Sequence, residues 1–75
     1  MKTYHFTAQI EKDVETGLFV GIVSNLPGAH TQAETLDELQ RNLHEVVELC
    51  LDELTAEELQ SLPEFVGVQQ VSVTK

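Results

Sequence analysis

The spacing of apolar residues changes once along the chain, and this change constrains the fold more than any other feature. From Thr3 to Glu11 every second residue is apolar, which is typical of a strand with one buried face. These apolar residues are Tyr4, Phe6, Ala8 and Ile10. After Thr35 the apolar residues recur at intervals of three and four, which predicts an amphipathic helix. The chain is therefore predicted to build a sheet first and to cover one of its faces with a helix.

A second strand is predicted over residues 18–23, after a polar turn that ends in Gly17. This strand carries apolar residues at both parities, and its even-numbered set is Leu18, Val20 and Ile22. If the even-numbered set faces the core, Phe19 and Val23 face the other side of the sheet and need separate cover. We therefore identify Phe19 and Val23 as candidate residues for contact with another chain.

The rest of the chain is divided by turn and capping signals. Residues 26–28, Leu-Pro-Gly, break the chain, and a third short strand is predicted from about Ala29 to Ala33. Thr35 and Glu38 fit a capping box, in which each residue's side chain bonds the other's backbone N–H, so the main helix is predicted to begin there.

A second capping-box pattern at residues 55–58 predicts a short helix that ends before Pro63. The valine-rich residues 65–73 then predict a final strand. Because the long helix returns the chain to the starting end, this strand is expected to lie parallel to the first. The sequence thus predicts one domain over residues 1–75, of the α+β class with the order βββα(α)β. Three strands form an antiparallel sheet, the C-terminal strand joins it, and one main helix packs on one face.

Negative charge is concentrated in the middle of the chain. The net charge is −9, from 13 acidic and 4 basic residues, and Gln32 to Glu64 alone holds ten acids and one base. Direct binding of nucleic acid is not expected, because phosphate would be repelled. The acids either attract a basic partner or form a solvated face that keeps a small protein dissolved. On the helix, Glu45, Glu48 and Asp52 are the candidate partner-binding acids, whereas Leu49 is interpreted as an isolated exposed leucine.

No group of residues predicts catalysis, a cofactor or a metal site. Cys50 lies on the apolar stripe, where a thiol behaves as a small hydrophobe. His44 and Glu48 form one helical pair without a third metal ligand. A metal-dependent nuclease, using Glu11 and Asp13, remains the third alternative. The longest apolar run has six residues, so we expect no membrane span and a cytoplasmic protein.

Several short motifs, in order, resemble the N-terminal domain of HicB-type antitoxins. They are Phe6-x-Ala8-x-Ile10-Glu11-x-Asp13, Gly17-x-Phe19-Val20-Gly21, Leu26-Pro27-Gly28-Ala29-x-Thr31, Glu34-Thr35-x-x-Glu38 and Asn42-x-x-Glu45. The resemblance covers about residues 4–54. It departs from the family pattern at Ala33, at Leu39 and at Ser24-Asn25, where the family usually has Gly, Ala, and a proline with an acid. The resemblance implies a partial RNase H-like fold and assembly as dimers or tetramers.

The resemblance also implies a partner, a small basic RNase toxin of the HicA type that this chain would bind and mask. Many members of the family continue into a DNA-binding domain, whereas this chain stops at Lys75, so operator binding is not expected of it. The alternative is an orphan homo-oligomeric scaffold or regulatory domain that has no toxin partner.

Overall fold

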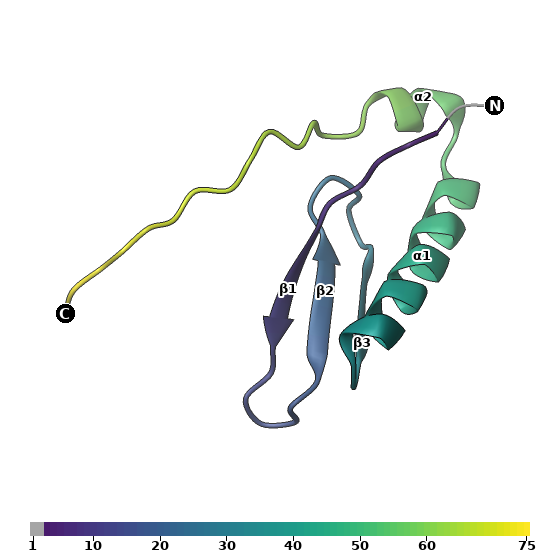
Figure 1. Cartoon of the computed structure of the whole chain (residues 1–75). Helices are drawn as coiled ribbons and strands as arrows, with labels where there is room; N and C mark the ends of the chain where they lie inside the picture. Colours follow the sequence, from purple (N-terminus) through teal and green to yellow (C-terminus); the bar gives the residue numbers. More distant parts are fainter. Residues whose placement is uncertain (1–2) are drawn as a thin grey trace.

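The computed structural model describes residues 3–75 as a three-stranded antiparallel sheet followed by two helices (Figure 1). The elements are β1 (Ala8–Lys12), β2 (Phe19–Val23), β3 (His30–Ala33), α1 (Leu36–Glu53) and α2 (Ala56–Gln60). The strands lie side by side in the order β1-β2-β3. This arrangement confirms the predicted α+β class, the three-stranded sheet and both helices.

Glycines with positive φ make the two connections between the strands compact. Gly17 has a φ of 75° and donates its backbone N–H to the Asp13 carbonyl at 2.8 Å, which closes the turn between β1 and β2. Between β2 and β3, Pro27 and Gly28 occupy the centre of a turn whose ends are joined by a 3.1 Å bond from Ala29 N to Leu26 O. The φ of 85° at Gly28, directly after proline, is typical of a type II turn.

The register places Phe19 and Val23 on the face of the sheet that α1 covers, so the predicted orientation of β2 is wrong. Cross-strand partners share a face, and Gly21, which has the same parity as Phe19 and Val23, faces Leu43 of α1. Val23 is only 4% exposed, whereas Ile22 of the other set is 42% exposed. The cause is Gly21. Because it has no side chain, α1 can pack close to this face of β2, and the spacing of apolar residues in β2 does not indicate this contact.

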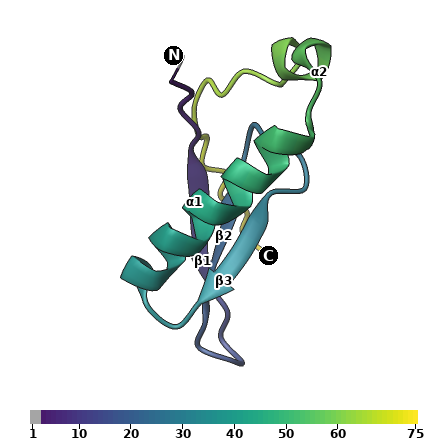
Figure 2. The ribbon, with the colours of Figure 1, turned by 90° about the vertical axis from the view of Figure 1, so that its right-hand side faces the viewer.

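The core lies between α1 and the β2-β3 half of the sheet (Figure 2). It consists of Val23, Leu26, Ala29, Ala33, Leu39 and Leu43. Leu39 is fully buried, and Leu43 packs so close to Gly21 that a Cβ there would stand 3.0 Å from the leucine Cδ2. The apolar residues of β1 have the predicted parity, but α1 covers this strand little. Ile10 therefore remains 52% exposed.

Threonine caps begin both helices. Thr35 Oγ1 accepts a 3.1 Å bond from Glu38 N at the start of α1, but the reciprocal bond of the predicted capping box is absent. At α2 the box is complete, because Thr55 Oγ1 accepts from Glu58 N at 3.1 Å and Glu58 Oε1 accepts from Thr55 N at 3.0 Å.

The predicted C-terminal strand is not present in the part of the chain that the structure describes. Residues 65–73 pair with no strand, and Figure 1 shows them leaving α2 and extending away from the sheet and α1. We call residues 65–75 the C-terminal tail. A strand needs a hydrogen-bonding neighbour, and the chain after α2 runs away from β1 (Figure 1). Within residues 3–75, neither helix is long and apolar enough to cross a membrane.

Candidate functional site

The outer face of α1 carries three carboxylates around a leucine. Glu45, Glu48, Leu49 and Asp52 follow the spacing i, i+3, i+4, i+7, which puts them on one side of a helix. Together they line a shallow depression of about 330 Å³. Leu49 is 64% exposed, so a large apolar side chain lies in water among acidic neighbours. We call these four residues the acidic face.

The electrostatics of α1 strengthen the negative potential at this end of the helix. The first turn holds Asp37 and Glu38, where acids stabilise the positive end of the helix dipole. The last turn holds no basic residue, and Asp52 and Glu53 lie there instead, beside the negative end. Two acids at the unfavourable end cost stability, and they increase the attraction for any cation that approaches the acidic face.

His44 adds a titratable group to the edge of the acidic face. Its Nδ1 lies 2.7 Å from Glu48 Oε1, and both side chains are mostly exposed. Such a pair at i, i+4 contributes only about 0.3–0.5 kcal/mol when the histidine is protonated. The pair therefore orients Glu48 along the helix without removing it from solvent, and its carboxylate stays accessible to a partner.

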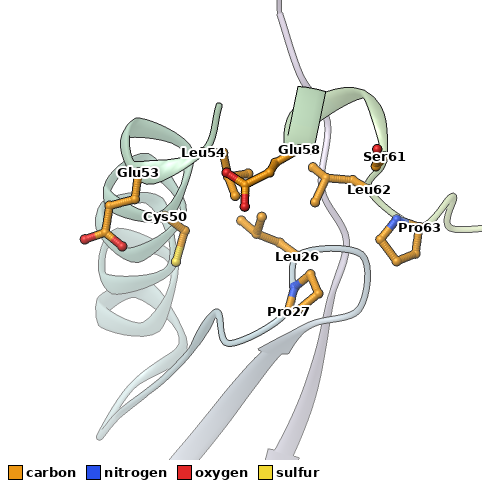
Figure 3. A pocket seen from close by; sticks show the side chains of 9 residues that line it. All are labelled: Leu26, Pro27, Cys50, Glu53, Leu54, Glu58, Ser61, Leu62 and Pro63. Atoms are coloured by element: carbon orange, nitrogen blue, oxygen red, sulfur yellow. The ribbon is translucent and has the colours of Figure 1, made fainter. Parts of the chain in front are cut away.

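A second hollow of about 500 Å³ lies where the end of α1, α2 and the loop after β2 meet (Figure 3). Leu26, Leu54 and Leu62 give it an apolar lining, and Cys50 points into the same region. Glu58 also reaches this hollow, but its carboxylate holds the α2 cap. The hollow can accept an apolar side chain, and Glu53 and Ser61 add polar groups to its lining.

Of the residues considered for chemistry, His44 and Glu48 are in contact, but no third ligand joins them within the described residues. Across residues 3–75, no three His, Cys, Asp or Glu side chains gather closely enough to hold a metal ion. Cys50 is half-buried and packs against the core, as its position on the apolar stripe predicts. Asp13 is engaged in its own turn, where its carboxylate accepts bonds from Glu15 N at 3.3 Å and Thr16 Oγ1 at 2.8 Å.

Of the five predicted partner-binding residues, the structure brings three together. Glu45, Glu48 and Asp52 share the acidic face. Phe19 and Val23 lie on the covered side of the sheet, where Val23 belongs to the core and the Phe19 ring lies 5.5 Å from Lys12 Nζ. Neither forms part of the open face of the sheet.

Sequence reasoning missed Leu49 as a member of this site. The sequence predicts that Leu49 is exposed, but the predicted partner-binding residues on this helix are only the acids around it. The signal was available in the spacing, because Leu49 lies four residues after Glu45 and three before Asp52.

Related proteins cover nearly the whole chain. The UPF0150 protein ssr1258 of Synechocystis sp. is 45% identical over 73 residues, which are 97% of this chain and 100% of the relative. A UPF0150 protein of Thermotoga maritima is 46% identical over 91% of this chain and 88% of its own length. A UPF0150 protein of Archaeoglobus fulgidus is also 46% identical, over 91% of this chain and 93% of its own length. No family model and no solved structure matches the chain.

Proposed function

The chain belongs to the UPF0150 family, and we propose that it works by binding and masking a basic surface of another protein. The partner is a small basic RNase toxin, and the chain acts as its antitoxin in the manner of the HicB-type domains that its motifs resemble. No catalytic step, cofactor or metal ion belongs to this function.

The observation that carries the proposal is the acidic face of α1. Three carboxylates surround the exposed Leu49, so the face offers charge at its rim and an apolar side chain at its centre. Protein interfaces commonly have this anatomy, with an apolar centre inside a polar rim. The segment from Gln32 to Glu64, with its charge of −9, extends the negative field well beyond the face itself.

The negative field and the exposed Leu49 contribute differently to the proposed binding. Complementary charge raises the association rate and disfavours acidic partners, but it contributes less to final affinity. Affinity comes from desolvated apolar contact and from well-paired charges near the centre of the interface. An RNase binds its substrate through lysine and arginine contacts to phosphate. A face that pairs with those cations competes directly with RNA.

Calorimetric titration of a small basic RNase of the HicA type tests the proposal. The decisive variant is the triple Glu45→Gln, Glu48→Gln and Asp52→Asn, which removes the three rim charges and preserves side-chain size. We expect its dissociation constant to rise at least about tenfold, with a weaker salt dependence. Leu49→Ala is expected to weaken binding by about tenfold as well, because it removes the apolar centre.

The matched control removes the same number of charges elsewhere, through Glu34→Gln, Glu57→Gln and Glu64→Gln. All three side chains are exposed and lie outside the acidic face. If the interaction uses the acidic face, this control changes the dissociation constant by less than about threefold. Equal losses in both triples would mean that net charge alone governs binding. No measurable binding or inhibition at micromolar concentrations would contradict the proposed function.

A second candidate function is a homo-oligomeric scaffold or regulatory domain without a toxin. The exposed apolar surface favours it, because Ile22 on the open sheet face and the valines of the tail are poorly covered. The two functions differ in one measurement. A scaffold self-associates and leaves the RNase active, whereas an antitoxin inhibits it in proportion to the amount added.

A further inference from the structure

The C-terminal tail is an apolar segment in a highly charged protein. Its four valines, Val66, Val68, Val71 and Val73, are between 71 and 88% exposed. Residues 65–73 hold no charged residue, although the chain has 13 acids. An extended, uncharged and valine-rich segment pairs readily with any open sheet edge. The tail thus has the composition of a strand and lacks a neighbouring strand.

The sheet has one edge that can receive such a strand. Its two outer strands are β1 and β3. At β3 the helix intervenes, because Asn42 Nδ2 donates a 3.2 Å bond to the Gln32 carbonyl. No bond of this kind is formed to the outer edge of the β1 residues 8–12 within the described chain. The outer edge of β1 is therefore the open one.

One apolar side chain of β1 is exposed beside this edge. Ile10 is 52% exposed on the face toward α1, whereas Gln9 and Glu11 lie on the other face of the strand. In the tail, Val66 and Val68 have one parity and Val71 and Val73 have the other, so either pair can lie on the same face as Ile10. A tail strand beside β1 would cover Ile10.

The tail and the edge formed by β1 also match in length and in net charge. Residues 4–12, which end with β1, and residues 65–73 each span nine positions, about 30 Å when extended. Within β1, Glu11 and Lys12 cancel, so neither surface carries net charge. Two copies that meet through β1 and the tail therefore avoid the repulsion between their acidic helices.

We propose that the tail of one copy pairs with the β1 edge of a second copy, and that the exchange is reciprocal. Within one chain, the tail leaves α2 and runs away from β1 (Figure 1). A two-fold dimer lets each tail reach the other copy's edge, and exchange of a terminal element is a low-cost route to such dimers. The missing fourth strand of each sheet is then supplied by its partner. This inference is independent of toxin binding, because it uses neither the acidic face nor Leu49.

The first test measures the dimer dissociation constant by light scattering and analytical ultracentrifugation. The wild-type chain is expected to have the mass of a dimer. Val71→Glu places a charge in the new strand and is expected to raise the dissociation constant at least about 100-fold. Val14→Glu is the matched control, because Val14 is 95% exposed in the turn after β1 and lies outside the proposed contact. The control is expected to stay within about twofold of wild type.

The second test locates the tail. A sample that mixes ¹³C-labelled and unlabelled copies is examined by isotope-filtered NMR for contacts between different copies. We expect contacts from the Val71 and Val73 methyl groups to residues 8–12 of the other copy. The inference is overturned if the chain remains monomeric at millimolar concentration, if Val71→Glu leaves the dimer unchanged, or if the tail contacts only its own β1.

Discussion

The helix-covered half of the sheet and the C-terminal tail use the same kind of side chain with opposite results. Val23 in β2 is 4% exposed, whereas Val71 in the tail is 83% exposed. Both lie in segments that the sequence predicts as strands. The difference is that α1 lies over β2, and no element of the described chain lies over the tail. Strand-forming composition therefore identifies a segment that needs cover, and a neighbouring element decides whether it is covered.

The largest effect on stability is expected for a side chain that α1 and the sheet bury completely. Leu39→Ala removes a fully buried side chain and should lower the free energy of unfolding by about 2–5 kcal/mol. Leu36→Ala makes the same change on the same helix at a side chain that is 54% exposed, and should cost less than about 1 kcal/mol. Urea denaturation at one protein concentration measures both. Similar costs would show that α1 is not seated on the sheet as described.

The close approach of α1 to β2 predicts the next effect. Gly21→Val places new atoms against Leu43, whose Cδ2 lies 3.0 Å from the position of a Cβ, and should cost about 1–3 kcal/mol. Combining it with Leu43→Ala should cost less than the sum of the single changes, because each relieves the other. Strict additivity in the urea experiment would contradict the contact.

The two threonine caps differ in what they hold. Thr35→Ala should cost about 1 kcal/mol, because α1 carries the buried Leu39 and Leu43. Thr55→Ala removes a complete capping box, yet α2 contains no buried residue, and the cost should be smaller. Thermal unfolding followed by circular dichroism distinguishes them. A larger loss of stability at Thr55 would mean that α2 contributes more to the stability of the fold than its exposure indicates.

The helix dipole predicts a stabilising change near the acidic face. Glu53→Lys exchanges an acid for a base in the last turn of α1 and should raise stability by about 0.3–1 kcal/mol at low salt. Asp37→Lys makes the reverse change in the first turn and should lower stability by a similar amount. Thermal unfolding at low and high salt checks the sign, because screening should reduce both effects.

The smallest effect is expected in the tail of a single copy. Val68→Ala should change stability by less than about 0.5 kcal/mol in dilute solution, because Val68 is 71% exposed. If tail exchange occurs, the cost should grow as protein concentration rises and the dimer forms. Unfolding measured over a concentration series separates these cases. A large cost at every concentration would mean that the tail packs within its own chain.

For the candidate site, the sequence predicted which charged residues lie together, but it did not predict which face of β2 is exposed. The spacing of Glu45, Glu48 and Asp52 on a helix already puts them on one side, because helix geometry is local. The orientation of β2 could not be obtained in this way, since its apolar residues occur at both parities and periodicity cannot choose between them. The choice depends on how close α1 comes to Gly21, and that distance is tertiary.

The order of strands and helices, the turns at Gly17 and Gly28 and the threonine caps were all determined by the sequence itself. Each depends on residues within a few positions of one another, whose backbone preferences act locally. Only the tertiary structure decided which side of β2 is buried, how little of β1 is covered and that residues 65–73 have no partner strand. Those outcomes depend on contacts between segments distant in sequence, and no local pattern specifies which neighbour a strand will meet.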